Sequence, residues 1–100
     1  MAETYPSPEE VARIAGETIL ALMTRGGTAS SGSDKSGPGD WFHRDSWRYN
    51  TDRVISHLTT ATQMVDGNKP EDAEGVEGHL RRALCRAAFV YVKFKQGKTQ

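Results

Sequence analysis

A stretch of small and polar residues, GGTASSGSDKSGPGD at positions 26–40, limits what this chain can fold into. Such residues bury too little apolar area to offset the entropy that an ordered chain loses, so they predict a flexible loop. Backbone N–H groups of the loop could also touch a phosphate, although the stretch carries no Walker pattern. Only 36% of the 100 residues are hydrophobic, and the core must come from what the loop leaves. A monomer would be marginal, and we expect helix faces to be shared in a homo-oligomer.

The segments on both sides of this loop have apolar residues at helical spacing. A capping box, Ser7–Glu10, opens the first segment and predicts a helix over residues 7–25. The later pattern predicts helices over 51–66 and 76–95. The expected buried faces contain Val11, Ile14, Ile19, Leu22, Met23, Val54, Leu58, Ala61, Val65, Leu80, Ala83, Leu84, Ala87, Ala88 and Tyr91. Residues 1–100 are therefore predicted to form a single all-α domain, a small bundle of three main helices completed by oligomerisation.

The charge balance and the cysteine content exclude several classes of protein. The 13 basic and 13 acidic residues give a net charge of zero, which argues against coating of DNA, since that requires a strong positive excess. No apolar run approaches the ~18 residues of a membrane span, and the N-terminus lacks a signal-peptide pattern. The single cysteine, Cys85, cannot form an internal disulfide and is typical of a small half-buried side chain. We therefore expect a cytoplasmic protein with no membrane partner.

Residues 41–50 differ sharply from the loop, because they combine aromatic and basic side chains. The rings of Trp41, Trp47 and Tyr49 could stack on bases, and the guanidinium group of Arg48 could pair with a phosphate. The same rings could instead seal a small helical core, with arginines packed over them. Both interpretations stay open at this point.

The last predicted helix carries cations on a face apart from its apolar one. At 100° per residue, His79, Arg82 and Arg86 share a face with Lys93, beside Phe89. This stripe is typical of a solvated surface, but it would also suit a phosphate.

Short motifs are spread over residues 47–91, nearly half of the chain. The motifs are Trp47, His57 with Leu58, Asp66 with Gly67, Glu74 with Gly75, and His79 with Leu80. In this order they resemble a phage-associated family, the dATP/dGTP diphosphohydrolase N-terminal domain. Members of that family show a tryptophan, a helix with a His-Leu pair, an acidic glycine-containing loop and a second His-Leu pair that opens a final helix. The resemblance implies a protein that handles nucleotides.

Two positions of the last helix depart from that family. Arg82 and Arg86 stand where the family tends to have His and Asn, and a guanidinium group neither ligates a metal nor accepts a proton. We therefore expect a non-catalytic, nucleotide-binding protein without a cofactor. By analogy, it would be a sponge that sequesters a cyclic nucleotide immune signal in the host cytoplasm. The candidate ligand-binding residues are Trp41, Trp47, Arg48, Tyr49, His57, His79, Arg82 and Arg86.

Two other functions stay possible from the sequence. The first is a metal-dependent pyrophosphohydrolase of dATP or dGTP, in which Glu71, Glu74 and Glu77 hold Mg²⁺ together with the two candidate histidines. Helical pyrophosphohydrolases of nucleoside triphosphates hold Mg²⁺ with two carboxylate pairs. No acidic residue follows Glu77 in this chain, so the second pair is missing and the charge of the triphosphate would be poorly neutralised. The second is a protein-interaction module whose polar stripes are only subunit contacts.

Overall fold

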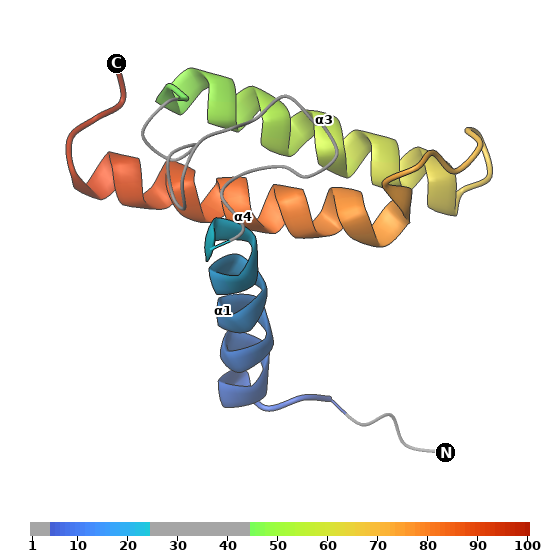
Figure 1. Cartoon of the computed structure of the whole chain (residues 1–100), viewed down its shortest axis with the longest axis horizontal. Helices are drawn as coiled ribbons and strands as arrows, with labels where there is room; N and C mark the ends of the chain where they lie inside the picture. Colours follow the sequence, from blue (N-terminus) through green and yellow to red (C-terminus); the bar gives the residue numbers. More distant parts are fainter. Residues whose placement is uncertain (1–4, 25–44) are drawn as a thin grey trace.

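The computed structural model describes residues 5–24 and 45–100, and this part of the chain is all-α. Its helices are α1 (Pro8–Thr24), α3 (Trp47–Val65) and α4 (Gly75–Lys95). Helices α3 and α4 form an antiparallel hairpin, and α1 stands across it with its C-terminal end against α4 (Figure 1). None of these described helices combines the length and the apolar composition that crossing a bilayer requires. The predicted loop, 26–40, lies outside the described residues.

Helix α3 begins earlier than the sequence pattern predicts. The helix was expected over 51–66, after a separate segment at 41–50, but it starts at Trp47. The reason is a cap that the pattern did not identify: Ser46 Oγ accepts a hydrogen bond from the backbone N–H of Tyr49 at 3.0 Å. The last part of the aromatic and basic segment is therefore the first turn of α3.

Helix α4 turns its polar stripe into the hairpin, where an apolar face was expected. Leu80, Leu84 and Tyr91 were predicted to be buried, and all three are exposed. The buried residues of α4 are His79, Ala83, Cys85, Arg86, Phe89 and Lys93. Burial of charged and polar groups is tolerated when partners satisfy them, and residues of α3 and of the flanking loops pair with several members of this stripe.

Helix α3 shows the same shift of its buried face. Leu58 and Val65 were expected in the core and are exposed, whereas Ala61 is buried as expected. The other buried residues are Asn50, His57 and Met64. Their positions follow a helical stripe that includes an amide and an imidazole, so this hairpin is held by polar contacts as well as by packing.

A small apolar cluster joins α1 to α4. Leu22, Cys85 and Phe89 form its buried centre, and Ile19 and Met23 pack against it. Burial raises the pKa of the Cys85 thiol to about 12, so the thiol is neutral at physiological pH. Cys85 therefore acts as a small apolar core residue.

The N-terminal part of α1 has an apolar side that is open to solvent. Val11 and Ile14 were predicted to be buried and are each about half exposed. Figure 1 shows this part of α1 standing away from the hairpin. Exposed apolar faces on small domains often mark protein contacts. A homo-oligomer therefore stays our prediction for how these faces are covered.

Candidate functional site

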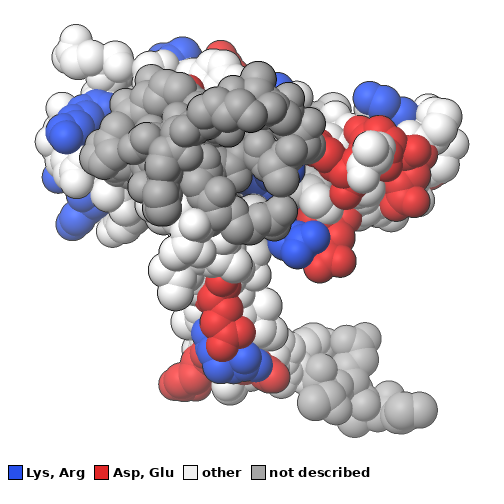
Figure 2. Space-filling model, viewed as in Figure 1, with Lys and Arg blue, Asp and Glu red and all other residues white. Residues whose placement is uncertain are grey.

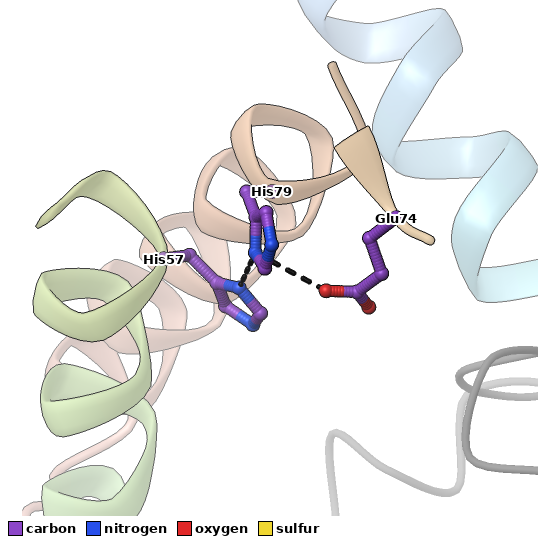
Figure 3. A group of neighbouring side chains, drawn as sticks. All are labelled: His57, Glu74 and His79. Carbon is purple, nitrogen blue, oxygen red and sulfur yellow. Dashed lines mark hydrogen bonds and ion pairs between the residues drawn. The ribbon is translucent and has the colours of Figure 1, made fainter. Parts of the chain in front are cut away.

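Three potential ligand side chains converge where the start of α4 meets the middle of α3. His57 comes from α3, His79 from the first turns of α4, and Glu74 from the residue just before α4, and the three side chains point toward one another (Figure 3). The two Nδ1 atoms of the histidines are 2.9 Å apart. Glu74 Oε1 lies 3.1 Å from Nδ1 of His79. One ligand atom from each residue lies within 4.8 Å of the other two.

The loop between α3 and α4 places Glu74 at this point. Gly75 has a φ of +72°, in the left-handed region that favours glycine, and this turns the chain into α4. Asp72 Oδ1 accepts the backbone N–H groups of Glu74 at 3.1 Å and of Gly75 at 3.0 Å. An Asx-type turn of this kind fixes the backbone immediately before the helix. Glu74 therefore projects from an anchored backbone.

The same aspartate also orients one of the histidines. Asp72 Oδ2 accepts a hydrogen bond from Nε2 of His79 at 2.8 Å. This bond is the main reason that the pKa of Asp72 is lowered below its ordinary value. In the tautomer of His79 that donates from Nε2, Nδ1 presents its lone pair to His57 and Glu74. A carboxylate behind a histidine is the usual device for fixing a metal-binding tautomer.

His57 is neutral at physiological pH. Burial, and secondly the positive charge of Arg53, lower the pKa of His57 from 6.5 to about 4. Nη2 of Arg53 lies 3.2 Å from Nε2 of His57 and can only donate to it. A neutral imidazole, unlike an imidazolium, has a lone pair available for a ligand.

Arg82 lies on the other side of Glu74. Its Nε is 2.6 Å from Glu74 Oε2, an ion pair whose alignment does not make a regular hydrogen bond. The side chain is only 11% exposed, and Nη1 has no hydrogen-bond partner among the described residues. Buried charged donors are normally satisfied, so an unpaired one indicates a place for a further acceptor.

Arg86, one turn further along α4, has a different role. Its Nη1 donates to Asp45 Oδ2 at 3.0 Å and to Asn50 Oδ1 at 2.8 Å. The guanidinium group also lies over the ring of Tyr49, 5.3 Å from its centroid. Arg86 thus joins the start of α3 to α4, and the protein itself supplies two acceptors for its Nη1 group.

The remaining aromatic and basic candidates lie at the start of α3. The guanidinium group of Arg48 is 5.2 Å from the centroid of the Trp47 ring. Trp47 also borders a cavity of about 320 Å³ together with Lys93 and Lys98, and its indole N–H has no hydrogen-bond partner in the described part of the chain. Trp47 is ten residues from His57, which is about 15 Å along a helix. Trp41 lies outside the described residues.

The acidic residues of the alternative magnesium site do not gather as a set of three. Among them only Glu74 belongs to the converging group. The side chain of Glu77 is exposed and lies 4.0 Å from Arg81, and Glu71 is exposed in the loop. Figure 2 shows acidic side chains over the loop end of the hairpin and basic ones over the C-terminal end of α4.

Sequence reasoning named His57, His79 and Glu74 but did not identify Asp72 or Arg53 as part of the site. The usable indication for Asp72 was its position three residues before Gly75, which is typical of a side chain that caps a turn. No local pattern indicated Arg53, because its contact with His57 depends only on helical spacing of four residues. The chain matches no family model, and no curated protein or solved structure is significantly similar to it.

Proposed function

We propose that this protein binds a nucleotide and holds its phosphate at Arg82. The observation that carries the proposal is the nearly buried guanidinium group whose Nη1 donor has no acceptor among residues 5–24 and 45–100. A phosphate oxygen is a geometrically suitable acceptor for such a donor, because guanidinium groups pair with phosphates in a fixed fork. The neighbouring His57 is uncharged at physiological pH, so it adds no positive charge beside Arg82.

Tyr49 is the candidate for stacking on the base. Its ring is 47% exposed and lies against Arg86, which is one helical turn from Arg82 on the same face of α4. A ring and a phosphate-binding guanidinium group at this spacing suit a single nucleotide unit. Trp47, further from Arg82, would serve a ligand with a second base, such as a cyclic dinucleotide. Sequestration of a cyclic nucleotide signal is the biological form of the proposal that the phage-family resemblance favours.

The test is a panel of nucleotides, including dATP, dGTP and cyclic di- and trinucleotides, added to the full chain in EDTA. A ligand at a hundredfold its dissociation constant adds about 2.7 kcal/mol of stability. For a domain of this size the melting temperature should rise by roughly 11–22 °C. The protein is then denatured, and the released ligand is identified. Intact ligand supports sequestration, and absence of any shift across the panel contradicts the proposal and favours an interaction module.

Substitution of Arg82 separates specific phosphate binding from general attraction. Arg82→Gln should weaken the affinity for the identified nucleotide by about 10-fold or more, since a hydrogen bond to a charged group contributes about 1.5–3 kcal/mol. Arg81→Gln is the matched control, because Arg81 neighbours Arg82 on α4 but is half exposed. We expect the control to bind within about twofold of the original chain. Equal losses in both variants would rule out Arg82 as the phosphate site.

A metal-dependent hydrolase of purine deoxynucleoside triphosphates is the second candidate function. It is favoured by the meeting of His57, Glu74 and His79, three of the residues that this alternative assigned to a metal and its water. The same panel with Mg²⁺, Mn²⁺ or Zn²⁺ in place of EDTA distinguishes it. Release of pyrophosphate and recovery of the monophosphate would support hydrolysis over sequestration.

A further inference from the structure

The two histidines contact each other, two carboxylates and an arginine. Four contacts have to be explained: Arg53 with His57, His57 with His79, and His79 with both Glu74 and Asp72. Each neutral imidazole has one donor nitrogen and one acceptor nitrogen. The two central contacts both use Nδ1 of His79, at 2.9 Å and 3.1 Å.

With both rings neutral, one contact is always left without a proton. Arg53 can only donate, so Nε2 of His57 accepts and its Nδ1 donates to Nδ1 of His79. The lone pair of His79 Nδ1 is then used, and the Glu74 carboxylate faces it at 3.1 Å with no hydrogen between them. A second proton on His79 Nδ1 gives Glu74 a hydrogen bond. His57 then has to accept at Nδ1 and carry its own proton on Nε2, where it faces the Arg53 donor.

We propose that His57, Glu74 and His79 bind one divalent transition-metal ion through Nδ1, a carboxylate oxygen and Nδ1. A cation at the centre accepts all three lone pairs at once. His79 keeps its Nε2–H bond to Asp72, and His57 moves its proton to Nε2, from which the half-buried Arg53 turns away. Two nitrogens on a tetrahedral zinc ion are about 3.3 Å apart, so the rings need to separate by only a few tenths of an ångström.

The surroundings of the three side chains support a built site. Asp72 holds His79 from behind, and Arg82 holds the second oxygen of Glu74. Outer partners of this kind fix ligand orientation, and their loss usually costs 10- to 100-fold in metal affinity. His57 and His79 are almost completely buried, so neither ring is free to turn in solvent. The donors therefore stay in place before an ion arrives.

The donor set selects the class of metal. Two imidazole nitrogens and one carboxylate suit Zn²⁺, Co²⁺, Mn²⁺ or Fe²⁺, whereas Mg²⁺ and Ca²⁺ prefer an all-oxygen shell. Three protein ligands leave at least one coordination position open. Water or a phosphate oxygen could take that position.

The experiment titrates the full-length, EDTA-stripped chain with Zn²⁺ by calorimetry and with Co²⁺ by visible absorption. We expect one equivalent of metal per chain and the d–d bands of a nitrogen-ligated Co²⁺ site. Glu74→Gln and His79→Gln should each lower the affinity by about 100-fold, and Asp72→Asn by about 10-fold. Glu77→Gln is the matched control, since Glu77 neighbours the site in sequence but is exposed, and it should bind within about twofold.

Two results would overturn the metal site: absence of stoichiometric uptake by the unsubstituted chain, or Glu74→Gln binding as tightly as that chain. Where a variant loses its helical circular dichroism, NMR of the unsubstituted chain replaces it, because Zn²⁺ should shift the imidazole signals of exactly two of the three histidines. The inference does not rest on nucleotide binding. If the chain binds a nucleotide in EDTA but takes up no metal, the proposed function stands and the metal site is ruled out. If the chain takes up one metal ion but binds no nucleotide in EDTA, the metal site stands and the proposed function is ruled out.

Discussion

Replacing Arg86 by alanine is expected to lower the free energy of unfolding by about 3–5 kcal/mol, the usual cost of breaking a buried ion pair from one side. The guanidinium group is 4% exposed and joins Asp45 and the fully buried Asn50 to α4. Its removal leaves the Asn50 carbonyl without its donor and Asp45 without this cation. Urea denaturation followed by helical circular dichroism measures the loss. Since small domains have only about 5–15 kcal/mol in total, the variant should be near the limit of folding.

Arg81→Ala provides the comparison for that measurement. Arg81 lies on the same helix, but its side chain is 50% exposed and its Nε lies 4.0 Å from Glu77 Oε2. Its substitution should change the stability by less than about 0.5 kcal/mol. If Arg86→Ala were as mild as this control, the polar contacts between the start of α3 and α4 would not be what holds the hairpin at that end.

Phe89→Ala should cost about 3–5 kcal/mol, for a different reason. Phe89 is 2% exposed and packs in the cluster with Leu22 and Cys85 that attaches α1 to α4. The substitution opens a cavity at that junction, so we expect α1 to lose its support before α3 and α4 separate. Thermal and urea unfolding give the total loss.

Phe94→Ala is the matched control for the core substitution. Phe94 lies on the same helix and is 62% exposed, so in a dilute monomer its loss should cost less than about 1 kcal/mol. A loss for Phe89→Ala no larger than that of this control would contradict the assignment of the cluster as the core. The comparison is made at low protein concentration, because a self-associated form could bury Phe94 as well.

The existence of the helices followed from local signals that act over a few residues. The predicted cap of the first helix is confirmed, because Ser7 Oγ accepts the backbone N–H of Glu10 at 3.1 Å. The all-α class is confirmed in the described residues for the same reason, since apolar spacing and caps are local properties. Among the helix bounds, the start of α3 differs most from the prediction, because Ser46 was a better cap than the residues considered.

The buried faces were harder to predict, because burial of a polar side chain depends on distant partners. Arg86 looked like a solvent-facing cation, and only the pairing with Asp45, 41 residues away, makes its burial favourable. The same holds for His57 and His79, which are 22 residues apart and whose burial depends on their contact with each other. Hydrophobic periodicity considers the apolar spacing within one segment and not the partners that other segments supply. It therefore assigned Leu80 and Tyr91 to the core, although both are exposed.

The candidate site was therefore predictable residue by residue but not as an arrangement. The magnesium alternative placed Glu74 beside Glu71, Glu77 and both histidines, and the structure keeps Glu74 with the two histidines but leaves Glu71 and Glu77 exposed outside the group. That grouping depends on the turn before α4, which Gly75 and the Asp72 side chain form together. A pattern of acidic residues indicates magnesium, whereas the mixed donor set that the turn creates favours a transition metal.

The way α1 is attached has a consequence for local unfolding. Its contacts with the apolar cluster come from Ile19, Leu22 and Met23, near its C-terminal end. Among the described residues, the hydrogen bonds and ion pairs of the preceding turns lie within this segment itself, such as the ion pair of Arg13 with Glu17. Isolated helices of this length are marginal in water. Backbone amides around Val11 and Ile14 should therefore exchange with deuterium far faster than those in the middle of α3 and α4. If a second copy covers this side of α1, the same amides should become protected as the protein concentration rises.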